Sequence, residues 1–173
     1  WLGDSTQELH GHLEILPEAS LAAIEQACRR ACADNHGPFT HVHILAHGLD
    51  APAPGTREMR HYLALCPSDG SGKPDPIDGQ RLARALRPLT TAREKLAVVT
   101  LASCDSGRAG SMIIGGANTA HELHSSGIPF VVASQFPLSY GGSVRLIQEL
   151  YDCLLRGDDP IGAAQHVRQA VSN

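Results

Sequence analysis

The sequence predicts a single α/β domain in which helices flank both faces of a mostly parallel sheet. Three short runs of apolar, often β-branched residues, at 42–46, 96–102 and 128–133, show little alternation, which is typical of strands buried on both faces. Helical patterns separate these runs, and a sustained order of strand and helix favours a parallel sheet. The chain has 173 residues, of which 42% are hydrophobic and 18% charged, so it is long enough to bury one sizeable core.

The N-terminal segment predicts a strand followed by an amphipathic helix. Residues 13–16 form a fourth and weaker strand candidate. Within 19–34, apolar residues at helical spacing occupy one face and charged residues the other, which predicts a helix. The apolar face consists of Leu21, Ile24, Cys28, Ala31 and Cys32. The two cysteines on it are predicted to be core residues, and Asn-His-Gly at 35–37 is a typical helix end.

Two further helices are predicted in the middle of the chain. Asp78 is a typical N-cap, and we expect the helix that follows it to end at Arg87, before Pro88. Residues 119–126 predict a shorter helix, which Gly127 closes.

A hairpin and two C-terminal helices complete the predicted elements. Residues 61–66 alternate between polar and apolar and lead into the turn-rich segment 67–72, which indicates a small hairpin or edge excursion. Residues 144–154 carry an apolar face at helical spacing, and Gly157 ends that helix. Pro160 is typical of a first helical position and begins the last helix.

Charge and composition exclude several classes of function. The net charge is −4, from 14 Lys and Arg against 18 Asp and Glu, and no basic stripe is present, so we expect no direct nucleic-acid partner. No apolar stretch is long enough to cross a bilayer and no signal segment is recognisable, so we expect no membrane contact and a cytoplasmic location. Five cysteines are an odd and sparse number, which favours reduced thiols over a disulfide framework.

Two residues capable of nucleophilic chemistry follow neighbouring predicted strands. His47 and Gly48 follow the first strand, and Cys104 follows the second. Carboxyl ends of parallel strands share one edge of a sheet, so the imidazole would lie close enough to accept the thiol proton and produce the nucleophilic thiolate. The backbone N–H groups of Gly48 and Cys104 are candidate donors to the oxyanion that such an attack creates.

The same cysteine and histidines allow other interpretations. A cysteine at the end of an apolar strand is often only a packed side chain, so the residues alone leave a non-catalytic role open. A cysteine phosphatase loop needs arginine six positions after the cysteine, and position 110 is Gly. The pairs at 41/43 and 121/124 are histidines that begin a zinc pattern, but no matching pair completes it, so we expect neither metal nor cofactor.

Three blocks carry a family resemblance: 41–48 (HVHILAHG), 101–107 (LASCDSG) and 127–139 (GIPFVVASQFPLS). They resemble the signature blocks of CHAT domains, caspase-like peptidases of clan CD that are related to separase and often attached to tetratricopeptide repeats. His47 precedes Cys104 by 57 positions (104 − 47), an order that fits the caspase-like clan. The resemblance extends over about residues 39–171.

The resemblance implies a caspase-hemoglobinase fold and hydrolysis of a peptide bond without a metal. It implies that His47 is general base and acid, that Cys104 is the nucleophile, and that the amides of Gly48 and Cys104 form the oxyanion site. Asp105 is then a candidate for the wall of the P1 pocket. Substrate would add as a strand along a strand end that consists of Ser134, Gln135 and Phe136.

Two departures from the family pattern limit what is carried over. Tyr140 stands where many relatives have an acidic residue, so a basic P1 preference does not follow, although Asp105 would supply one. Relatives usually carry a strand and helix before the segment corresponding to 13–16, and a last strand after the final helix. We therefore expect 1–173 to be a single CHAT-like domain from a longer protein.

The leading hypothesis is an intracellular cysteine endopeptidase that cleaves a dedicated protein substrate. We expect a partner protein or an attached tetratricopeptide-repeat region to activate it by ordering the loops Gly48–Gly55 and Arg108–Asn118. Relatives in bacterial defence cut gasdermin-like or other dedicated proteins, which by analogy suggests antiviral defence. The alternatives are a non-catalytic scaffold with this fold and a cysteine hydrolase or acyltransferase acting on small substrates.

Overall fold

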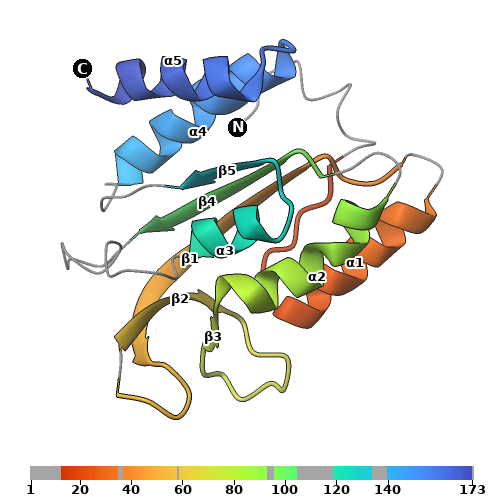
Figure 1. Cartoon of the computed structure of the whole chain (residues 1–173), viewed down its shortest axis with the longest axis vertical. Helices are drawn as coiled ribbons and strands as arrows, with labels where there is room; N and C mark the ends of the chain where they lie inside the picture. Colours follow the sequence, from red (N-terminus) through yellow and green to blue (C-terminus); the bar gives the residue numbers. More distant parts are fainter. Residues whose placement is uncertain are drawn as a thin grey trace.

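A five-stranded sheet organises the described part of the chain, with the strand order β3-β2-β1-β4-β5 (Figure 1). The computed structural model describes residues 13–34, 37–57, 59–92, 96–104, 119–133 and 140–172. The strands are β1 (His41–Pro52), β2 (Met59–Leu65), β3 (Asp75–Ile77), β4 (Val98–Cys104) and β5 (Phe130–Ala133). The helices are α1 (Leu21–Ala33), α2 (Gly79–Thr91), α3 (Thr119–Ser125), α4 (Tyr140–Leu155) and α5 (Pro160–Ser172).

Most strands of this sheet run in one direction. β1 pairs with β4 and β4 with β5 in parallel, whereas β2 is antiparallel to both β1 and β3. Only β2 therefore runs opposite to the other described strands. The predicted α/β class with a mostly parallel sheet is confirmed.

Helices cover both faces of the sheet. On β5, Val131 packs against the core under α1, α2 and α3, whereas the next residue, Val132, packs against the α4–α5 pair. Successive strand residues point to opposite faces, so these two cores lie on opposite sides of the sheet, as Figure 1 shows. Burying each large aliphatic side chain contributes about 1.5–3 kcal/mol. Those fully buried in the larger core are Ile77, Leu82, Leu86, Leu89, Leu96, Leu123 and Ile128.

Local sequence explains where α1 begins and which face it buries. The Ser20 hydroxyl accepts a hydrogen bond from the Ala23 amide at 3.2 Å and caps the helix. Cys28 is 3% exposed, and burial raises the pKa of its thiol to about 12. Cys28 is therefore a core residue, as predicted. The same prediction was wrong for Cys32, which is exposed because it lies at the edge of the buried stripe.

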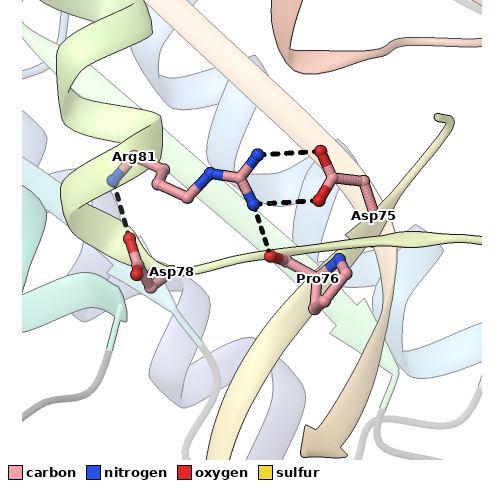
Figure 2. Close-up of polar contacts among 4 residues, drawn as sticks. All are labelled: Asp75, Pro76, Asp78 and Arg81. Carbon is pink, nitrogen blue, oxygen red and sulfur yellow. Dashed lines mark hydrogen bonds and ion pairs between the residues drawn. The ribbon is translucent and has the colours of Figure 1, made fainter. Parts of the chain in front are cut away.

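A polar network joins β3 to the first turn of α2 (Figure 2). The Arg81 guanidinium donates to both carboxylate oxygens of Asp75 at 2.9 Å and to the Pro76 carbonyl at 2.8 Å. The carboxylate of Asp78 accepts the Arg81 backbone N–H at 2.7 Å, which confirms it as the N-cap. This network fixes the edge strand β3, which is only three residues long and which sequence analysis did not identify.

The predicted end of α2 before Pro88 was wrong. The helix continues through Pro88 to Thr91. Proline removes one helical hydrogen bond, but continuing the helix buries Leu89 completely in the row begun by Leu82 and Leu86. The Thr91 hydroxyl also donates to the Arg87 carbonyl at 3.0 Å near the helix end.

The strand predicted at 13–16 was also wrong, because this segment has no regular structure. Leu13 is 53% and Ile15 is 73% exposed, and of the apolar residues in this segment only Leu16 packs against the core. Further along the chain, the Ala19 carbonyl accepts a hydrogen bond from the amide of Cys66, the residue after β2, at 3.1 Å.

The strand predicted at 42–46 is longer than expected and runs to Pro52, whereas the other helix ends and the hairpin agree with the structure. The β2–β3 hairpin is the predicted edge excursion. Gly127 and Gly157, with φ of 94° and 87°, follow α3 and α4, and Pro160 begins α5. Among the described residues, no helix combines the length and apolarity that crossing a bilayer requires.

Candidate active site at the end of β4

The sheet brings His47 and Cys104 together. The two residues are Cα partners in the parallel β1–β4 pair, and Cys104 is the last residue of β4. The sequence argument from strand ends therefore predicted their proximity correctly. The His47 side chain is exposed, so it is accessible from solvent.

His47 is also the position at which β1 changes neighbours. β1 pairs with β4 over residues 41–47 and with β2 over residues 47–52. From Gly48 onward, β1 has no partner on its β4 side within the described part of the chain. An unpaired strand edge leaves backbone groups available to a ligand, and it lies directly beside the candidate dyad.

The chain belongs to the CHAT domain family. The sequence model of the CHAT domain matches residues 1–173, which extends the resemblance beyond the range 39–171 expected from the three blocks. This is a family of caspase-like proteases. No curated protein and no solved structure matches the chain.

Within this CHAT domain, Gly48 is covered by the ring of His61. A Cβ atom at position 48 would lie 2.4 Å from Cε1 and 2.6 Å from Nε2 of that ring. The φ angle of Gly48 is outside the left-handed region, so the reason for glycine is this close approach. Sequence analysis considered Gly48 only as a candidate oxyanion donor and did not single out His61.

His61 is held by an acidic partner across the β1–β2 hairpin. It is the register partner of Asp50, and its Nδ1 lies 3.2 Å from the Asp50 carboxylate. Its side chain is 11% exposed, and its Nε2 is buried with no hydrogen-bond partner among the described residues. The alternation at 61–66 indicated a strand, but only the hairpin register reveals this contact.

The histidines considered as zinc ligands have other neighbours. The His43 ring packs edge-on against Tyr151 with centroids 5.8 Å apart. Burial of the ring lowers the pKa of His43, although part of the residue remains open to solvent. His41 Nδ1 lies 2.9 Å from the Thr40 hydroxyl, and His124 Nδ1 lies 3.1 Å from the Ile128 carbonyl. The described residues include no group of three or more side chains suited to hold a metal ion.

Several predicted site residues lie outside the described part of the chain. They are Asp105, Ser134, Gln135 and Phe136, together with the expected loop Arg108–Asn118. The other expected loop, Gly48–Gly55, was partly wrong, because β1 continues to Pro52. Pairing with β2 stabilises this extension beyond the last residue paired with β4.

Proposed function

We propose that this CHAT domain is a cysteine endopeptidase with a caspase-hemoglobinase fold and a His47/Cys104 dyad. The observation that carries the proposal is the register pairing of these two residues at the point where the parallel pairing of β1 with β4 ends. Membership of a caspase-like protease family supports the same reaction. The mixed sheet with helices on both faces agrees with the proposed fold.

In the first half of the reaction, His47 accepts the proton of the Cys104 thiol. The thiolate attacks the carbonyl carbon of the scissile peptide bond, forming a C–S bond and an oxyanion. The backbone N–H groups of Gly48 and Cys104 donate to this oxyanion, an interaction whose loss typically costs about a hundredfold to a thousandfold in rate. Collapse of the intermediate breaks the C–N bond, and protonated His47 gives its proton to the leaving amine.

Hydrolysis of the thioester completes the cycle. His47 removes a proton from water, which attacks the same carbonyl carbon and forms a second oxyanion. The C–S bond then breaks, and the thiolate regains its proton from His47. No metal or cofactor takes part in the proposed steps.

The proposal extends to the substrate and its surroundings. Substrate adds as a strand at Ser134, Gln135 and Phe136, with Asp105 in the wall of the P1 pocket. The domain spans 1–173 and is cytoplasmic, and a partner protein or tetratricopeptide-repeat region activates it against a dedicated protein substrate. An antiviral defence role rests on analogy alone.

The test is cleavage of the intact proteins of a cell lysate, which also supplies candidate activating partners, and of a library of short peptides made from them, both read as new N-termini by mass spectrometry. The wild type, Cys104→Ala and His47→Ala are incubated under identical conditions. New termini that appear only with the wild type support the proposal. Absence of cleavage by the wild type, or cleavage that survives Cys104→Ala, contradicts it, and cleavage of short peptides alone favours a small-substrate hydrolase.

A further inference from the structure

The His61 ring fills the space that a side chain at position 48 would occupy. Real Cβ atoms essentially never approach within 3.0 Å of other heavy atoms, yet two ring atoms of His61 fall inside that distance from the Cβ position of residue 48. The ring therefore rests on the main chain of β1. The point of contact is Gly48, the residue directly after His47.

The Asp50 carboxylate sets the orientation of the His61 ring. It accepts from Nδ1–H, and this contact holds the ring in one orientation. Nε2 is buried, and no group in the described ranges hydrogen-bonds to it. A buried polar atom without a partner carries an energetic cost, so its position calls for a reason other than stability.

The location of Gly48 supplies that reason. Gly48 is the first residue of β1 beyond the pairing with β4, so among the described elements only β2 flanks it. His61 belongs to β2 and adds a rigid ring to this one-sided support. An oxyanion donor must lie about 2.7–3.1 Å from the oxyanion, and a misplacement of about 1 Å in an active site can cost about a hundredfold in rate.

We propose that His61, oriented by Asp50, is a positioning residue that fixes the Gly48 backbone amide for oxyanion stabilisation. The proposal rests on the proposed cysteine chemistry. His61 acts through Gly48 and touches neither the thiol nor the scissile bond. It predicts that loss of the ring impairs reactions that pass through an oxyanion and spares reactions of Cys104 that do not.

Two small reagents separate these reactions. Iodoacetamide alkylates a thiolate by direct displacement at carbon, with iodide leaving and no oxyanion formed. The thiolate attacks the carbonyl of p-nitrophenyl acetate to form a tetrahedral oxyanion, from which p-nitrophenolate leaves. Peptide mapping by mass spectrometry gives the rate of each modification at Cys104.

The decisive variant is His61→Asn, because the asparagine amide retains a donor near the position of Nδ1 and removes the ring edge that contacts Gly48. We expect Cys104 acetylation to fall about tenfold to a hundredfold and alkylation to stay within about twofold of wild type. Asp50→Asn is a milder second variant and should shift acetylation in the same direction. His166→Asn is the matched control, because His166 also pairs with a carboxylate, that of Glu149 at 3.2 Å, but lies on α5.

Each outcome decides the proposal. Selective loss of acetylation in His61→Asn, with His166→Asn unchanged, supports it. Equal loss of both reactions together with a lower melting temperature makes His61 a purely structural residue and overturns it, as does no loss in either reaction. If wild-type Cys104 is alkylated no faster than the exposed Cys32 and Cys66, the proposed function itself fails and takes this inference with it.

Discussion

Replacing Gly48 with alanine would put a methyl group in space that the His61 ring already fills. The new Cβ would lie 2.4 Å from Cε1 and 2.6 Å from Nε2, whereas ordinary contacts begin near 3.4 Å. The ring must therefore retreat by about 1 Å, and its hydrogen bond to Asp50 resists this movement. Overpacking costs about 1–3 kcal/mol and a weakened hydrogen bond about 0.5–1.5 kcal/mol, so we expect a loss of about 2–3 kcal/mol.

The assay is reversible unfolding by urea and by heat. For a domain of this length the expected loss corresponds to a melting temperature lower by roughly 5–10 °C. In a His61→Asn background the ring edge is absent, and Gly48→Ala should cost less than about 0.5 kcal/mol, because φ at this position imposes no strain on alanine.

The matched control is Gly141→Ala in α4, where a Cβ would have no heavy atom within 4 Å. Alanine is favoured over glycine in a helix, so this variant should be neutral or more stable by up to about 1 kcal/mol. The reasoning is refuted if Gly48→Ala behaves like Gly141→Ala, or if its cost is unchanged when His61 is replaced.

Three further predictions concern the framework of the site. Arg81→Lys loses the two-pronged contact with Asp75. Because both side chains are partly exposed, we expect the free energy of unfolding in urea to fall by only about 0.5–1.5 kcal/mol, and an unchanged free energy would contradict the network. Burial raises the pKa of the Cys28 thiol from 9.0 to about 12, so the unfolded state releases this proton first and stability falls as pH rises from 9 to 12. Cys28→Ala should flatten that alkaline decline, and an equally steep decline would contradict the assignment. Burial raises the pKa of Tyr151, and the Thr100 hydroxyl opposes this rise. That hydroxyl is buried, and among the described residues no group meets hydrogen-bond geometry with it. Thr100→Val should therefore leave the free energy of unfolding unchanged or raise it by up to about 1 kcal/mol, and a loss of more than 1 kcal/mol would show that the two hydroxyls are bonded.

Local patterns predicted most elements of this fold because their signals are local. Apolar runs identified β1, β4 and β5, and capping residues such as Ser20 and Asp78 coincide with helix starts. The errors arose where tertiary burial outweighed a local signal. Pro88 is tolerated inside α2 because continuing the helix buries Leu89. The strand candidate at 13–16 failed because Leu13 and Ile15 stay exposed and only Leu16 reaches the core.

The candidate site was predictable only in part, for a similar reason. The strand-end rule predicted that His47 lies near Cys104 without knowledge of the register, because both residues follow apolar runs that pair in parallel, although β1 continues past His47 to Pro52. His61 was missed because its contact with Gly48 depends on the hairpin register that pairs it with Asp50, 11 residues earlier. The substrate-binding assignments at Asp105 and 134–136 rest on family resemblance and stay predictions.

The central claim is that His47 activates Cys104. The most direct test is the pH dependence of iodoacetamide alkylation at each cysteine of the wild type and of His47→Ala, with the exposed Cys32 and Cys66 as internal references. The account predicts that near neutral pH Cys104 reacts at least about tenfold faster than both references, and that His47→Ala removes this advantage. Equal rates at the three cysteines, or a Cys104 rate that does not change in His47→Ala, would contradict it.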